Sequence, residues 1–168
     1  VQMPGVAVER DNTSSLVGEV SSNFSSNWYS RAYLQWNPHD SDVEKGSAEL
    51  RYNKDNRSVV NVAYRYEQSI QEQFDTSFAW PVDNNWNLVG RWNYSIRNDE
   101  TLDVLAGVEY DSCCWAFRFV GRHFANDTDG SDYSTGVFLQ LELKGLGSLG
   151  HKADKVIEEG VLGYKVKH

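Results

Sequence analysis

Apolar and polar residues alternate along most of the chain between residues 15 and 143. Short polar segments interrupt the alternation and divide this region into nine runs. A period of two places successive side chains on opposite faces of a strand, so each run predicts a strand with one apolar and one polar face. The runs are about 9–11 residues long, which is enough for a tilted strand to cross a hydrocarbon layer.

The ends of the chain lack this alternation. Residues 1–14 contain Pro4 and Gly5 and are predicted to form a loop, and residues 15–143 hold the nine strands. Residues 144–168 are predicted to form a tail. Three closely spaced glycines in this tail indicate a tight, irregular path, with at most one short helical turn at 153–159.

Two fold classes fit strands of even spacing: a small soluble barrel or sandwich, and a transmembrane β-barrel. Three features favour the second. The polar parity keeps charged residues in mid-strand, as a water-filled lumen would, and the connections between runs alternate between shorter and longer. Large aromatic residues also gather near the strand ends, as in an interfacial girdle; these are Trp28, Trp36, Tyr66, Trp80, Trp86 and Tyr110. We therefore predict an all-β, antiparallel, up-and-down transmembrane β-barrel segment.

The connections also predict an orientation. Outer-membrane barrels have short periplasmic turns and longer external loops, so the connections after runs one, three, five and seven are expected on the periplasmic side together with the C-terminus. Nine strands cannot complete a bacterial barrel, whose strand number is even. We expect further strands upstream of this sequence.

Composition excludes several other classes. The formal net charge is -8 and no basic patch is present, which argues against nucleic-acid binding. No apolar run approaches the roughly 18 residues of a transmembrane helix. The four histidines, at positions 39, 123, 151 and 168, have no zinc-site spacing, so no metal or cofactor is predicted.

The only two cysteines, Cys113 and Cys114, are adjacent in the turn between the seventh and eighth runs. A disulfide between neighbours would strain the intervening peptide or force it into the cis form. Each cysteine therefore needs another partner. That partner would lie either on another chain or on a part of the protein outside this sequence.

Several stretches closely resemble the LPS-assembly protein LptD family. They are FAWPVDNNWNLVGRWNYSIRNDETLDVLAGVEY (78–110), GVEYDSCCWAFRFVGRHF (107–124), GVFLQLELKGLGSLG (136–150) and VLGY (161–164). The resemblance implies a large barrel in the Gram-negative outer membrane that inserts lipopolysaccharide into the outer leaflet without catalysing a reaction. It also implies two protein partners, the plug lipoprotein LptE and a periplasmic Lpt bridge reached through an N-terminal domain. It further implies that Cys113 and Cys114 form disulfides with cysteines near that domain.

The ninth run contains Ser134, Gly136, Leu139 and Leu141, a spacing that resembles the C-terminal strand signal read by the barrel-assembly machinery. The charged residues on the predicted polar faces of the strands have two interpretations. They could solvate the lumen and pair across strands, or they could contact lipopolysaccharide or the plug. We favour the first, because both signs are mixed and the glycolipid is anionic.

Two other functions remain open from the residues. A general porin would share the barrel but normally lacks a cysteine pair. An outer-membrane hydrolase would need a lipid-facing serine and histidine, for which His123 with Ser134 is the only candidate, and no G-x-S-x-G motif is present.

Overall fold

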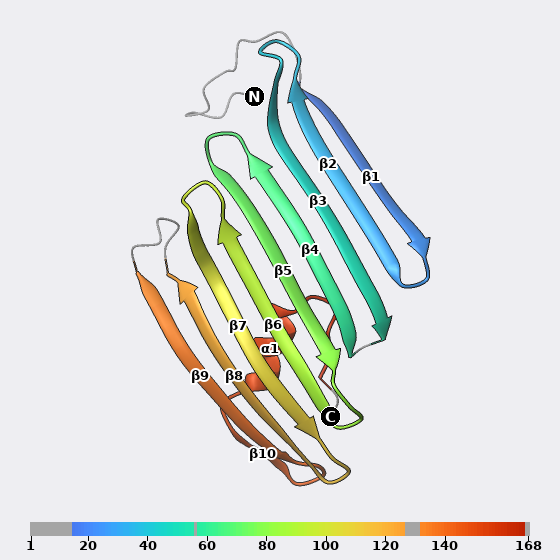
Figure 1. Ribbon diagram of the computed structural model, residues 1–168, viewed down its shortest axis with the longest axis vertical. Coiled ribbons are helices and arrows are strands. Elements are labelled where there is room, and N and C mark those ends of the chain that lie inside the picture. Colours follow the sequence, from blue (N-terminus) through green and yellow to red (C-terminus); the bar gives the residue numbers. More distant parts are fainter. Residues whose placement is uncertain (1–14, 56, 127–131, 167–168) are drawn as a thin grey trace, which may run out of the picture.

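A single antiparallel sheet dominates the structure, a computed structural model that describes residues 15–55, 57–126 and 132–166. Its ten strands follow one another in sequence order (Figure 1). The predicted loop 1–14 lies outside the described residues. The strands are β1 (Leu16–Ser25), β2 (Trp28–Asn37), β3 (Asp42–Asp55), β4 (Ser58–Glu67), β5 (Gln71–Pro81), β6 (Trp86–Ser95), β7 (Glu100–Asp111), β8 (Trp115–Ala125), β9 (Tyr133–Leu143) and β10 (Gly147–Gly150).

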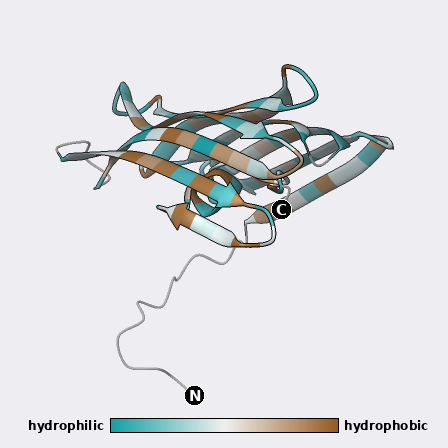
Figure 2. Ribbon diagram, turned by 90° about the horizontal axis from the view of Figure 1, so that it is seen from below, coloured by the Kyte–Doolittle hydropathy of each residue, from teal (hydrophilic) through white to brown (hydrophobic). Residues whose placement is uncertain are grey.

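Strands β1 to β9 confirm the nine predicted runs as an up-and-down barrel segment. Their register places the residues of the predicted apolar face opposite residues of the same face in the neighbouring strands. Leu34 of β2, for example, lies opposite Gly18 of β1 and Gly46 of β3. Figure 2 shows the result as alternating hydrophilic and hydrophobic bands along the curved sheet, with helix α1 (Ala153–Gly160) beneath it. We call the face that carries α1 the inner face and the opposite one the outer face.

One strand departs from the predicted parity. The alternation placed Leu102 with the apolar residues of its run, yet Leu102 lines a hollow on the inner face. The pairing between β6 and β7 shifts after Asn93. Asn93 faces Asp103, whereas the next residue, Tyr94, faces Thr101, so Leu102 has no residue opposite it. Leu102 is thus the extra residue of a β-bulge, which reverses the side to which the strand end points.

The connections differ less in length than predicted. Those following β1, β3, β7 and β9 are short, but residues 82–85 after β5 are as many as residues 38–41 after β2. None of the helices in the described part of the chain is long and apolar enough to cross a membrane.

The C-terminal region is more regular than the predicted irregular tail. Residues 147–150 form β10, which pairs with the last four residues of β9. Residues 153–160 then form α1, longer than the single turn expected. The glycines at 145, 147 and 150 have positive φ values and serve the turns around β10, so they bend the chain without preventing the helix that follows.

Helix α1 is held by packing on the inner face. Ala153 and Ile157 of the helix and Val161, which directly follows it, are spaced four residues apart and are fully buried, so they form one apolar stripe. No side chain of Lys152 caps the N-terminus. Instead, the Oε1 atom of Gln140 in β9 accepts a hydrogen bond of 3.0 Å from the backbone N–H of Asp154. An eight-residue helix has little stability of its own, so it depends on these contacts with the sheet.

The sheet offers α1 a matching apolar row. On the inner face, where most positions are polar, neighbouring strands place small or apolar residues directly opposite one another: Val59, Ala79, Val89, Gly107, Val120 and Phe138. Glycine is required within this row, because a Cβ at 107 would lie 2.8 Å from the carbonyl oxygen of Phe119. Most of this row and the helix stripe belong to one apolar core, which Leu105, Tyr164 and Val166 complete.

Candidate functional site

The outer face is apolar and exposed. Leu34, Leu88, Phe119 and Leu139 are each 40% exposed or more and lie in mid-strand on different strands. A water-soluble sheet would bury such a face, and contiguous exposed apolar surface marks an interaction with another apolar phase. This face is suited to contact hydrocarbon.

Aromatic rings edge the outer face at the end that holds Cys113 and Cys114. Four of the predicted girdle residues, Trp28, Trp80, Trp86 and Tyr110, lie here. Ring centroids are 4.9 Å apart for Trp28 and Tyr52, 6.4 Å for Tyr52 and Trp80, and 5.0 Å for Trp86 and Tyr110. Rings at these separations form a nearly continuous row, as expected where a strand meets an interface.

The other two predicted girdle residues, Trp36 and Tyr66, lie at the opposite end of the sheet. Trp36 faces Val43 near the end of β2, and Tyr66 faces Glu72 near the start of β5. Other rings accompany them at this end; their pairs are Phe74 with Trp92, Trp92 with Tyr94, and His123 with Tyr133. Aromatic residues thus border the apolar surface on both sides.

The cysteine turn is tied to the chain that follows β9. The backbone N–H of Lys144 donates a 3.0 Å hydrogen bond to the carbonyl oxygen of Cys114, and the Lys144 ammonium forms an ion pair with Asp111. Both cysteines are free and exposed. Their Sγ atoms lie 2.7 Å apart. The turn therefore presents two accessible thiols on a fixed backbone.

The two thiols differ chemically. The hydrogen bond with Cys114 lowers the pKa of the Cys113 thiol below its usual value, and the Ser112 hydroxyl lowers it further. The same contact raises the pKa of Cys114. Because the thiolate is the reactive form in disulfide exchange, Cys113 is the more readily activated of the pair.

A buried polar cluster lies on the inner face next to this turn. The Arg118 guanidinium is 2.7 Å from the carboxylate of Glu142 and 3.4 Å from that of Glu109. The Tyr164 hydroxyl donates a 2.6 Å hydrogen bond to Glu109 and accepts one of 3.1 Å from Asn87. We call these five residues the Tyr164 clamp. It joins β6, β7, β8 and β9 to the segment after α1.

Burial determines the protonation of Tyr164 and the need for ion pairs in the Tyr164 clamp. The Arg118 side chain is 2% exposed, and burial, together with the carboxylate of Glu109, raises the pKa of the Tyr164 phenol above its usual value. Tyr164 therefore remains a neutral donor. A charged group buried this deeply is tolerated only when its partners are in place.

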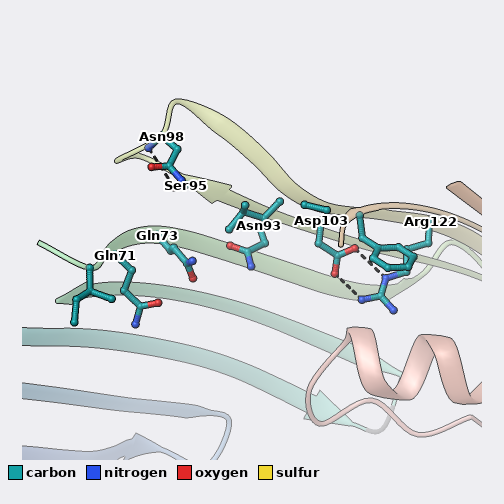
Figure 3. Close-up of a pocket in the computed structure, with 11 residues that line it drawn as sticks. Gln71, Gln73, Asn93, Ser95, Asn98, Asp103 and Arg122 are labelled. Carbon is teal, nitrogen blue, oxygen red and sulfur yellow. Dashed lines mark hydrogen bonds and ion pairs between the residues drawn. The ribbon is translucent and has the colours of Figure 1, made fainter. Parts of the chain in front are cut away.

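A second ionic chain runs across the inner face farther from the cysteine turn. Arg91 contacts Asp75 at 2.7 Å and Asp103 at 3.3 Å, and Arg122 contacts Asp103 at 2.9 Å. These four charges sum to zero. Of these four, Asp103 and Arg122 line a hollow of about 390 Å³, shown in Figure 3.

The residues of the predicted assembly signal lie on both faces of β9, and the hydrolase candidate combines His123 of β8 with Ser134 of β9. Ser134 and Gly136 belong to the inner parity, while Leu139 and Leu141 face outward. His123 contacts the Thr135 hydroxyl at 2.8 Å, and the Ser134 hydroxyl accepts a hydrogen bond from Asn126. The structure does not bring His123 and Ser134 together as a base and nucleophile, because adjacent positions of β9 point to opposite sides.

Sequence reasoning missed the Tyr164 clamp and the apolar row. Two signals were present. In several successive strands, a small or apolar residue occupies one of the alternate positions that are otherwise polar. Ala153, Ile157 and Val161 also have the spacing of one face of a helix. Only the register between the strands shows that these two patterns meet.

Known proteins resemble this chain closely. A family model described as LptD, LPS transport system D, matches residues 4–86. Proteins named "LPS-assembly protein LptD" are 43% identical over 164 residues in Nitrosococcus oceani, 34% over 169 in Pseudomonas aeruginosa and 30% over 172 in Methylococcus capsulatus. The matches cover 98%, 84% and 90% of this chain and 22%, 18% and 17% of those relatives. The chain thus spans less than a quarter of their length.

Proposed function

Since the chain belongs to the LPS-assembly protein LptD family, we propose that it forms part of the wall of an outer-membrane β-barrel that assembles lipopolysaccharide into the outer leaflet. In this proposal the chain performs no catalysis. It contributes strands to a translocon whose remaining strands come from elsewhere in a longer protein.

The observation that carries the proposal is the outer face. Its apolar residues are exposed over nine consecutive strands and are bordered by aromatic rings at both ends. The inner face of the same strands carries the charged groups. An apolar outside with a polar inside is the arrangement that lets a closed sheet cross a bilayer around an aqueous lumen.

The cysteine turn gives the proposal an orientation. We place this turn and the C-terminal segment on the periplasmic side, where disulfides persist. Cys113 and Cys114 would be oxidised to cysteines in another part of the longer protein. Support comes from their exposure and from the lowered pKa of Cys113, which favours its reaction as a thiolate.

The partners follow from the same reading. The polar inner face would meet the plug lipoprotein LptE, the periplasmic Lpt bridge would deliver lipopolysaccharide through an N-terminal domain, and the barrel-assembly machinery would read the β9 signal. Of the β9 residues, Leu139 is 47% exposed on the outer face. An exposed side chain there is accessible to an assembly factor before the barrel closes.

Depletion of the full-length protein tests the transport function. Cells depleted of it should lose lipopolysaccharide from the outer leaflet, measured by binding of a sugar-specific antibody to intact cells, and the wild-type gene should restore it. Normal surface lipopolysaccharide in depleted cells would refute the proposal. A porin would instead be recognised by lost solute uptake with unchanged surface lipopolysaccharide.

The disulfides need a separate measurement. Non-reducing mass spectrometry of the native membrane should find Cys113 and Cys114 linked to distant cysteines. Finding both thiols free would argue against the proposed link, while leaving the transport function to be judged by the depletion experiment.

A further inference from the structure

The hollow on the inner face lies at the end of the sheet away from the cysteine turn. Gln71 opens β5, Ser95 closes β6 and Ala125 closes β8, and all three line it. None of the lining residues belongs to the C-terminal segment 151–166. Its volume of about 390 Å³ falls within the range of small-molecule sites, roughly 300–1,000 Å³.

Neutral polar side chains dominate the hollow. Four amides and one hydroxyl from neighbouring strands and the following turn surround it in Figure 3; they are Gln71, Gln73, Asn93, Ser95 and Asn98. An amide presents both donors and an acceptor, so this lining can bond to a hydroxyl in either direction.

Two of these amides have unused hydrogen-bonding capacity. The Oδ1 atom of Asn93 is buried without a hydrogen-bond partner in the described part of the chain. Within the same residues, no side-chain hydrogen bond involves Gln73. A buried polar atom without a partner costs free energy, which a turn of the Asn93 amide toward a donor on a ligand would recover.

The two charged residues that line the hollow neutralise each other. Asp103 holds Arg122 through two hydrogen bonds of 2.9 and 3.0 Å, and it also contacts Arg91, which lies outside the lining. The charge of Arg122 is therefore balanced within the hollow and offers little attraction to a phosphate group. The lining favours an uncharged ligand over an anion.

An apolar surface completes the hollow. Leu102, which the bulge turns inward, and Phe124 both line it, and the Arg122 guanidinium lies 4.8 Å from the Phe124 ring centroid. A sugar ring has both kinds of surface, with hydroxyls at its edge and C–H groups on its face. Amides beside apolar side chains match that combination.

We infer that this hollow is a binding site for the uncharged sugar rings of the glycolipid that the barrel transports. The inference rests on the proposed function. It adds a contact for the carbohydrate part of the cargo, held by the amides of Gln73 and Asn93 on the inner wall.

The test uses the full-length protein in detergent micelles, titrated with lipid-free core oligosaccharide from which the phosphates have been removed. Binding is measured by saturation-transfer NMR. We expect saturable binding that inorganic phosphate does not displace. Gln73→Leu and Asn93→Leu should each weaken it about fivefold to tenfold, the size expected for the loss of one hydrogen bond.

Gln35→Leu is the matched control, because Gln35 lies on the inner face of β2 outside the hollow, and it should bind as the wild type does. The inference is overturned if the oligosaccharide does not bind, if phosphate displaces it, or if all three variants weaken binding equally. Failure here, with surface lipopolysaccharide still dependent on the protein, would remove the sugar site and leave the proposed function intact.

Discussion

The inner face has two halves that use the same strands and differ in what covers them. Toward the cysteine turn, α1 and the segment after it bury the Tyr164 clamp, so that the Arg118 side chain is 2% exposed. Toward the other end, the side chain of Arg122 remains 28% exposed and borders an open hollow. Both halves pair arginine with carboxylates.

Because the C-terminal segment covers only one half of the inner face, similar ion pairs have different roles in the two halves. In the covered half a lost partner would leave a charge without water, so the pairs hold the C-terminal segment in place. In the open half Arg122 is 28% exposed, so water can replace part of what a lost carboxylate supplied, and its pair with the buried Asp103 contributes less to stability than the pairs of Arg118. There the pairs neutralise a surface that remains free for a ligand.

The largest expected effect comes from removing the central cation of the covered half. Arg118→Met leaves Glu109 and Glu142 buried without their cation, and should lower the free energy of unfolding by about 3–5 kcal/mol. Arg65→Met, on the exposed part of the same face, should change it by less than about 0.5 kcal/mol. Urea unfolding of the full-length protein in lipid vesicles measures both. Equal losses would remove the distinction between the halves.

The next effect concerns the packing of α1. Ile157→Ala creates a cavity in the fully buried core and should weaken docking of the helix by about 2–5 kcal/mol. Hydrogen exchange at the amides of residues 153–160 should accelerate accordingly, while Lys155→Ala, at an exposed position of the same helix, should leave it nearly unchanged. Unaltered protection in Ile157→Ala would show that the helix does not depend on the apolar row.

Much of the sheet could be predicted from alternation alone. A strand has only two faces, so the parity of residues such as Leu34 and Arg31 fixes where each points once the strand exists. The aromatic residues at both strand ends followed from the same pattern. The signal failed at Leu102, because an inserted residue in a β-bulge reverses parity without changing composition.

The C-terminal segment could not be placed from sequence. Its glycines suggested an irregular path, whereas its helix forms because the apolar row offers a surface to pack against. That surface exists only when Ala79 meets Val89, and Val120 meets Phe138, in the observed register. Tyr164 likewise has no local signal, since its partners Asn87 and Glu109 are far away in sequence. Such contacts depend on tertiary structure.

A smaller effect is expected from the clamp's hydroxyl. Tyr164→Phe removes the donor to Glu109 and leaves the ring in place, and should destabilise the docked segment by about 1–3 kcal/mol. Limited proteolysis between 150 and 166 should become faster. Tyr133→Phe is the control, because Tyr133 is exposed on the outer face, and it should show wild-type cleavage. Indistinguishable cleavage of the two variants would mean that packing alone holds the segment.

The smallest stability effect is expected in the open half, at Gln73. Gln73→Leu removes an amide that has no side-chain hydrogen bond within the described residues, so the free energy of unfolding should change by less than about 0.5 kcal/mol. The same urea titration measures it. If the hollow serves a ligand, the substitution should weaken oligosaccharide binding while stability stays constant, which is the opposite of the result expected for Tyr164→Phe. A loss of stability comparable with that of Tyr164→Phe would mean that the open half also supports the fold, and that its polar lining is not reserved for a ligand.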